Sequence, residues 1–240
     1  MKVLLLAAGR GERLRPLTER VPKPMIPIGG EPLLKHQILL LKNHGIREIF
    51  INLFHRQRVI TDYFGNGEKF GVKINYFPEE ILLGTAGTAL KLRDHFPDRF
   101  LVLYGDNFTN CNLADLMEYH HRQTPLGTIA VFDRDQVPNS GMAGGRVLLS
   151  EKGEIKAFQE GGGLDSPWVN AGIYVLEPSI FNFIPDKVPC DFGKDVFGRV
   201  LQERKRLAAF PLKGYLFGID TPQAYQEAEE YCNDHHTNAL

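Results

Sequence analysis

The stretch KVLLLAAGRGERLRPLTERVPKPMIP, residues 2–27, sets the fold class of this chain. It opens with the short apolar run Val3–Ala8, which stops at a glycine and therefore predicts a buried β-strand. Gly9 and Gly11 follow, and glycines let the main chain approach a ligand so that backbone N–H groups bind phosphate oxygens. Five basic residues and four prolines lie between positions 10 and 27. The stretch therefore predicts a stiff, cationic loop that binds a nucleoside triphosphate.

Two other phosphate-binding motifs are absent from the sequence. There is no Gly-x4-Gly-Lys-Ser/Thr, and Leu14 stands where the dinucleotide fingerprint has a third glycine or alanine. No acidic residue follows the second predicted strand at a position suited to bind a ribose. A nicotinamide-dependent oxidoreductase is therefore disfavoured.

Composition further narrows the class of protein to which this chain can belong. The 240 residues suffice for one α/β domain, and the net charge of −1 gives no global positive field for nucleic acid. No apolar run is long enough for a membrane span, and we expect no signal peptide and a cytoplasmic protein. Cys111, Cys190 and Cys232 lack metal-ligand spacing and are expected to be free thiols.

Strands and helices alternate through the first half of the chain. Strands are predicted at Val3–Ala8, Arg47–Leu53, Val72–Phe77, Arg99–Tyr104 and Gly127–Asp133, and helices at Glu31–Gly45, Arg56–Phe64, Gly84–His95 and Leu113–Arg122. This alternation predicts an α/β fold with a Rossmann-like, mainly parallel sheet and helices on both faces. The loops after the first, third and fourth strands are expected to line one ligand-binding mouth.

The second half is less regular. We predict a hairpin of Gly144–Leu149 and Glu154–Gln159, strands at Trp168–Leu176, Arg206–Pro211 and Tyr215–Ile219, and helices at Pro178–Ile184, Lys194–Arg204 and Pro222–Cys232. No sharp linker separates the halves. We therefore predict a single domain, residues 1–240, with a nucleotide half of about 1–135 and a mixed acceptor half of about 136–240. His235-His236 offers metal ligands, but a disordered end is the favoured interpretation.

Residues 6–34, LAAGRGERLRPLTERVPKPMIPIGGEPLL, resemble the signature of the sugar-1-phosphate nucleotidylyltransferases. That signature reads Leu-Ala-Ala-Gly-x-Gly-x-Arg-Leu-x-Pro-Leu-Thr and then Pro-Lys-Pro, and every element is present here. The resemblance implies an enzyme that combines an NTP with a sugar 1-phosphate, using Mg²⁺, to give an NDP-sugar and pyrophosphate. Many relatives form dimers, so monomer and homodimer both stay open.

The resemblance implies that Arg13, Lys23 and Asp106 are catalytic residues, with Arg13 over the leaving pyrophosphate and Lys23 near the reacting phosphates. Asp106 follows a buried strand and a glycine, as in the family's metal motif, although it would also suit a helix cap. At the second metal ligand the sequence departs from the family, because relatives read Asp-Ile-Gly-Thr-Pro where this chain reads Gly-Ile-Asp-Thr-Pro at 218–222. Asp220 is the expected ligand, and capping the last helix is its alternative role.

The loop EEILLGTAG, residues 79–87, resembles the family segment that contacts the base and ribose. A carboxylate there would accept hydrogen bonds from guanine, whereas an amide would suit uracil or thymine, so the sequence favours GTP. The residues expected to bind the nucleotide are Leu6, Ala8, Gly9, Gly11, Glu79, Glu80, Gly84 and Thr85.

Four residues match family positions that contact sugar hydroxyls, namely Gly145, Glu160, Asn170 and Gly172. Many relatives follow this glutamate with a lysine that holds the sugar phosphate, but glycines occupy positions 161–163 here. Lys194 is the substitute we expect, with an ordinary solvated helix residue as the alternative.

The resemblance favours a mannose-1-phosphate or heptose-1-phosphate guanylyltransferase acting in polysaccharide biosynthesis. Uridylyl-, thymidylyl- or cytidylyl transfer to glucose 1-phosphate or another hexose 1-phosphate is the nearest alternative. The exchanged aspartate at position 220 and the missing lysine also allow a third interpretation, an inactive homologue that binds an NDP-sugar.

Overall fold

A nine-stranded sheet containing strands from both halves of the chain forms the centre of the protein. The computed structural model describes residues 1–140, 144–161 and 163–235. Seven strands lie side by side in the order β11 (Ile155–Gln159), β10 (Arg146–Leu149), β12 (Trp168–Leu176), β6 (Phe100–Tyr104), β1 (Lys2–Leu6), β4 (Glu48–Leu53) and β5 (Lys73–Pro78). The other two are β8 (Gly127–Asp133), which pairs with β12, and β13 (Leu207–Pro211), which pairs with β8.

The nucleotide half of the sheet is parallel, as the alternation of strands and helices predicts. β1 pairs in parallel with both β4 and β6, and β4 pairs in parallel with β5. Leu6 is in register with Asn52 on one side and Tyr104 on the other. These three residues therefore lie at the carboxyl edge of the sheet, where α/β proteins bind their ligands.

The acceptor half is mixed. β12 runs antiparallel to β6 and β8, and β10 and β11 form the predicted hairpin. The pairing of β12 with β8 shifts register between Asn170 and Tyr174. Gly172 lies in this irregular stretch with a φ of +68°, and a Cβ atom there would lie 2.8 Å from the Tyr104 ring. Glycine is required because both the left-handed backbone and the close aromatic ring exclude a side chain.

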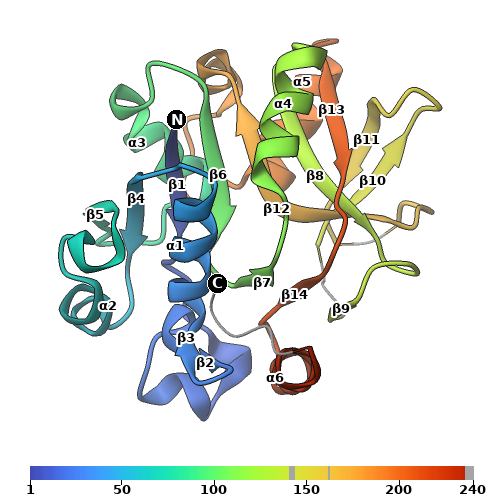
Figure 1. Cartoon of the computed structure of the whole chain (residues 1–240). Helices are drawn as coiled ribbons and strands as arrows, with labels where there is room; N and C mark the ends of the chain where they lie inside the picture. Colours follow the sequence, from blue (N-terminus) through green and yellow to red (C-terminus); the bar gives the residue numbers. More distant parts are fainter. Residues whose placement is uncertain (141–143, 162, 236–240) are drawn as a thin grey trace.

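Helices cover both faces of the sheet. α1 (Leu33–Asn43), α2 (Gln57–Phe64) and α4 (Leu113–Gln123) contribute leucines, isoleucines and a phenylalanine to the core on one face. α3 (Thr85–Lys91) and α5 (Gly198–Gln202) contribute to the core on the other face. In Figure 1, α1 and α4 lie in front of the sheet. The predicted α/β class is therefore confirmed.

The segment after β1 forms no α-helix. Its proline-rich sequence folds into three short 3₁₀ turns at Glu12–Leu14, Leu17–Glu19 and Lys23–Met25. Leu14 and Ile26 are buried in a separate apolar cluster with Phe217 and Ile219 from the end of the chain. This cluster holds the basic N-terminal loop against the C-terminal segment.

A small second sheet also joins the C-terminal segment to an earlier part of the chain. It consists of β7 (Asn107–Thr109), β14 (Leu216–Gly218) and β9 (Asn139–Ser140), and the β7–β14 pairing is antiparallel. A two-stranded piece, β2 (Pro27–Ile28) with β3 (Glu31–Pro32), leads into α1. α6 (Pro222–Asp234) follows β14 directly.

Several predicted helices differ from the observed elements. The predicted helix Gly84–His95 ends earlier, at Lys91, and is followed by a 3₁₀ turn at Arg93–His95. A separate 3₁₀ turn lies at Glu68–Phe70, before β5. The predicted helix Pro178–Ile184 is a 3₁₀ helix at Pro178–Phe183. The predicted helix Lys194–Arg204 begins two residues earlier, as a π-helical turn at Phe192–Phe197 that continues into α5.

No helix within the described ranges is both long enough and apolar enough to cross a membrane. Cys111 and Cys190 are buried thiols, and burial raises their pKa values to about 12 and about 11. Neither is suited to thiolate chemistry near neutral pH.

Candidate active site

A cavity of about 360 Å³ opens at the carboxyl edge of β1, β4 and β6. The loops after β1, β5 and β6 meet there, as predicted. Seven expected site residues line it: Leu6, Ala8, Gly9, Glu79, Gly84, Thr85 and Asp106. Asn52, Leu82, Tyr104, Pro189 and Asp191 also line it and were not expected.

Next to this cavity, one lysine lies between two carboxylates. The Lys23 Nζ atom is 2.5 Å from Oδ2 of Asp106 and 2.5 Å from Oδ1 of Asp220. An Arg13 Nη2 atom lies 3.0 Å from the same Asp220 oxygen. The structure therefore brings together the three predicted catalytic residues and both predicted metal ligands.

The electrostatics of this centre favour charged side chains. Burial opposes the charge of Lys23, but Asp106 and Asp220 outweigh it and raise the lysine pKa. Burial likewise opposes ionisation of Asp220, but Lys23 and Arg13 outweigh it and lower the aspartate pKa. Lys23 is therefore a cation and Asp220 an anion at neutral pH.

Backbone contacts fix the two aspartates. The Gly105 N–H donates to the Leu6 carbonyl at 2.8 Å, and a Cβ at Gly105 would lie 2.6 Å from that oxygen. The Ile219 N–H donates to the Asp106 carbonyl at 2.9 Å. The strand β1 and the segment before α6 thus hold the turn that carries Asp106.

Other residues take the capping roles that were open for these aspartates. The Thr221 hydroxyl accepts a hydrogen bond from Ala224 N at 3.2 Å and caps α6. Asn112 caps α4 by accepting from Ala114 N and Asp115 N. Asp106 and Asp220 therefore cap neither helix. Their carboxylates contact Lys23 instead.

This pair of carboxylates fits a divalent cation. Mg²⁺ in proteins takes one or two carboxylates and fills its remaining positions with phosphates and water. Asp106 and Asp220 already converge on a positive charge, the Lys23 ammonium. Among the described residues, no group of three or more His, Cys, Asp or Glu side chains is placed to hold a metal. His235 stacks on Tyr231, and His236 lies outside the described residues.

Glu79 lines the cavity, and its carboxylate also makes contacts inside the protein. Its buried carboxylate accepts hydrogen bonds from Asn52 Nδ2 (2.8 Å), Thr88 Oγ1 (2.5 Å) and Leu83 N (3.1 Å). Glu79 therefore holds the loop in place, with two donors on Oε1 and one on Oε2. Glu80 is exposed and is not among the lining residues.

Gly9 and Gly11 differ in their surroundings. A Cβ at Gly9 would meet no atom within 4 Å, so the backbone there is open to a ligand. Gly11 does not line the cavity and has a φ of +64°; its carbonyl accepts from Thr18 Oγ1 at 2.7 Å. Gly11 thus shapes the loop, and Gly9 lines the cavity itself.

None of the expected sugar residues is among those that line this cavity. Asn170 donates to the Tyr174 hydroxyl at 2.8 Å, which donates to the Tyr104 hydroxyl at 3.2 Å. Glu160 lies against the backbone of Gly145 and Gly193, since a side chain at either glycine would collide with it. Burial raises the Glu160 pKa, and the charge of Lys194 opposes that shift. Gly172, as described above, packs under Tyr104.

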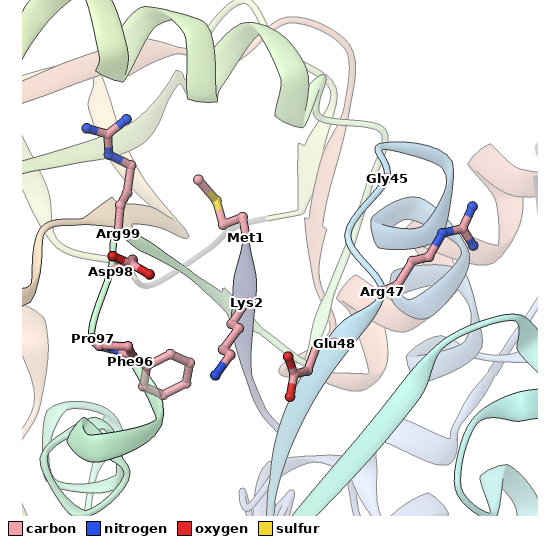
Figure 2. A pocket seen from close by; sticks show the side chains of 9 residues that line it. All are labelled: Met1, Lys2, Gly45, Arg47, Glu48, Phe96, Pro97, Asp98 and Arg99. Carbon is pink, nitrogen blue, oxygen red and sulfur yellow. The ribbon is translucent and has the colours of Figure 1, made fainter.

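A larger cavity, of about 450 Å³, lies at the opposite edge of the sheet (Figure 2). No expected site residue lines it. Its Lys2 ammonium donates to the His95 carbonyl at 3.0 Å, and Arg99 pairs with Glu177 at 2.7 Å. Figure 2 shows the guanidinium groups of Arg47 and Arg99 pointing away from each other, so they do not converge on a phosphate.

The chain belongs to the nucleotidyl transferase family, whose profile matches residues 2–235. It is 35% identical over 217 residues to a UTP–glucose-1-phosphate uridylyltransferase of Synechocystis sp., covering 84% of this chain and 55% of that protein. It is 34% identical over 236 residues to a probable mannose-1-phosphate guanylyltransferase 1 of Oryza sativa subsp. japonica, covering 94% and 63%. The chain thus spans less than two thirds of these curated relatives.

The fold is shared with a putative glucose-1-phosphate thymidylyltransferase from Bacillus anthracis, with a TM-score of 0.84 and 24% identity, over 98% of this chain and 96% of that one. These comparisons confirm the family resemblance of residues 6–34. They also confirm the α/β fold predicted from the alternation of strands and helices.

Proposed function

We propose that the protein transfers a nucleotidyl group from an NTP to a sugar 1-phosphate, releasing pyrophosphate. The observation that carries this proposal is the position of Lys23 between Asp106 and Asp220, beside a cavity at the carboxyl edge of a parallel sheet. Membership of the nucleotidyl transferase family supports it.

The reaction is an in-line attack of a phosphate oxygen on the α-phosphorus, and its main requirement is to position two anions and neutralise their charge. The sugar phosphate is already ionised, so no strong general base is needed. Arg13 is suited to the leaving pyrophosphate, because its side chain is 62% exposed while Asp220 holds its guanidinium at the site. Mg²⁺ held by Asp106 and Asp220 would neutralise phosphate charge.

We place the nucleoside against Gly9, Glu79 and Leu82, which line the cavity. The open backbone at Gly9 suits phosphate oxygens, and the apolar Leu82 side chain suits a base. Asp106 lines the same cavity, and we propose that the α-phosphate meets the acceptor beside it.

For the substrates, we propose GTP with mannose 1-phosphate or heptose 1-phosphate as the first pair. The mannose-1-phosphate guanylyltransferase relative matches 94% of this chain, against 84% for the uridylyltransferase. UTP with glucose 1-phosphate is the alternative pair, since the two relatives are similarly identical.

A pyrophosphate-release assay tests the proposal. It crosses the four NTPs with mannose, glucose and heptose 1-phosphates, with and without Mg²⁺, and uses Asp106→Asn as the inactive control. We expect a Mg²⁺-dependent signal with one NTP that the substitution abolishes. Silence in every combination, together with tight binding of an NDP-sugar, would instead identify an inactive NDP-sugar-binding homologue.

A further inference from the structure

A segment of the acceptor half, residues 189–192, forms part of the wall of the nucleotide cavity. Backbone hydrogen bonds join it to the loop at 83–87: Cys190 N donates to Leu83 O (2.9 Å), and Ala86 N and Gly87 N donate to Cys190 O (2.9 and 3.0 Å). A side chain at Gly84 would collide with the Cys190 backbone. The loop expected to bind the nucleoside and this acceptor segment are therefore one packed unit.

One side-chain pair completes the junction. Oδ1 of Asp191 accepts hydrogen bonds from Thr85 N at 3.0 Å and from Thr85 Oγ1 at 3.3 Å. The same hydroxyl accepts from Phe192 N at 2.9 Å. Thr85 is the first residue of α3, so these hydrogen bonds join Asp191 to the start of that helix.

The geometry leaves the other carboxylate oxygen for a ligand. Both hydrogen bonds recorded for the Asp191 carboxylate, among the parts of the chain that the structure describes, end on Oδ1. Asp191 lines the cavity together with Tyr104 and Asp106. Its Oδ2 is thus available to accept a hydrogen bond beside the proposed reacting centre.

The chain next to Asp191 contacts residues expected to bind the acceptor. Glu160 packs against Gly193, two positions after Asp191, and Lys194 follows directly in the chain. The charge of Asp191 also helps to raise the pKa of Glu160, after the larger effect of burial. Asp191 therefore links the cavity to the segment that contacts an expected sugar residue.

We infer that Asp191 is a specificity-determining residue for the sugar, and that Thr85 positions it. Oδ2 of Asp191 accepts a hydrogen bond from a hydroxyl of the sugar 1-phosphate. An ionised carboxylate makes strong hydrogen bonds to hydroxyl donors, and a site built for a hydroxyl discriminates against an analogue that lacks it. This inference rests on the proposed function, because the ligand is that reaction's acceptor.

Two substitutions separate recognition from positioning. Asp191→Asn keeps an oxygen for Thr85 and replaces the free acceptor by an NH₂ donor of the same size. Thr85→Val keeps the carboxylate and the backbone N–H but removes the hydroxyl. Asp98→Asn, at the exposed opposite edge of the sheet, is the matched control.

Kinetics with deoxy analogues of the accepted sugar 1-phosphate give the first test. In Asp191→Asn we expect KM for the sugar 1-phosphate to rise about 10- to 100-fold with little change in KM for the NTP. Wild type should discriminate against one deoxy analogue, and Asp191→Asn should lose that discrimination.

Thr85→Val should lower kcat more than it raises KM, while retaining discrimination. Equal losses for NTP and sugar, or unchanged discrimination, would overturn the inference.

Calorimetry measures the binding of sugar 1-phosphates and NDP-sugars to wild type and to Asp191→Asn. Its results distinguish failure of the proposed function from failure of the inference about Asp191. If wild type shows no turnover but binds a sugar ligand in an Asp191-dependent manner, the proposed function fails and the inference stands. If turnover occurs and Asp191→Asn binds the sugar as wild type does, only the inference fails. If wild type neither turns over nor binds any of these sugars, both fail.

Discussion

The Nζ atom of Lys23 lies 2.5 Å from Oδ1 of Asp220, although the two residues are 197 positions apart in the chain. Asp106 completes the arrangement on the other side of the ammonium. A cation between two carboxylates neutralises charges that would otherwise repel each other. Lys23 therefore stabilises this site in the free protein in the way that a bound divalent cation would.

Replacing Lys23 by Met should lower the free energy of unfolding by about 2–4 kcal/mol, because two partly buried carboxylates lose their partner. Mn²⁺ or Mg²⁺ should restore more stability to the variant than it adds to wild type. Urea unfolding over a metal series measures both effects. Lys35→Met, which removes the surface pair with Glu31, should cost less than about 1 kcal/mol. An identical metal dependence in Lys23→Met and wild type would contradict this account.

Glu79→Gln tests the internal role of this carboxylate. The amide can keep the contacts from Asn52 and Thr88, but its NH₂ then faces the Leu83 N–H. Two opposed donors should cost about 1–3 kcal/mol of stability. The ratio of kcat/KM for GTP over UTP should stay unchanged. A tenfold change in that ratio would show that Glu79 reads the base.

Gln37→Leu probes the support of Asp106. The buried Gln37 amide donates to the carbonyls of Tyr104, at 2.9 Å, and of Asn107, which flank the Gly-Asp turn. Leaving two buried carbonyls unpaired should cost about 1–3 kcal/mol and raise the Mg²⁺ concentration needed for half-maximal activity. Thermal unfolding and a Mg²⁺ titration check this. A stability loss with an unchanged titration would show that the turn keeps its geometry without Gln37.

Gly172→Ala should destabilise the protein by about 1–3 kcal/mol, because the site combines a positive φ with a Cβ position 2.8 Å from the Tyr104 ring. Displacing Tyr104 should also raise KM for the sugar 1-phosphate. Gly198→Ala is the control, since a Cβ there meets nothing within 4 Å and φ is −58°. That variant should be as stable as wild type or more so.

His120 should make a contribution to the free energy of unfolding that is lost at acid pH. Burial lowers its pKa, and its ring nitrogens contact Thr128 Oγ1 at 2.8 Å and Glu177 Oε1 at 3.1 Å. The unfolded chain takes up this proton first as the pH falls below about 6.5, so the folded state loses stability from there downward. His120→Asn should flatten the stability profile between pH 7 and 5. Exposed His121→Asn should leave the profile unchanged.

Local patterns were sufficient for the parts of the fold that depend on neighbouring residues. The apolar run Val3–Ala8 predicted β1, and alternating strands and helices predicted the parallel half of the sheet. Prolines between positions 10 and 27 predicted a loop without an α-helix. The signature residues Arg13 and Lys23 were assigned to one site because the family pattern is contiguous in sequence.

The contacts that the sequence did not indicate involve partners far apart in the chain. Glu79 resembled a base reader, and no local pattern shows that Asn52 and Thr88 also donate to its carboxylate. The signal for Asn52 was its place near the end of a predicted strand, at the ligand edge. Nothing in the sequence around Asp191 indicated a pocket residue, because its position depends on the docking of residues 189–192 against Thr85.

The sequence by itself therefore determined the family and the α/β class, since these follow from contiguous motifs and short-range periodicity. Tertiary structure decided that Asp220 joins Asp106 around Lys23, that Thr221 caps α6, and that Asp191 faces the cavity. The physical reason is that hydrogen bonds and ion pairs depend on distances of a few ångströms between segments distant in sequence, and only the packed chain sets those distances.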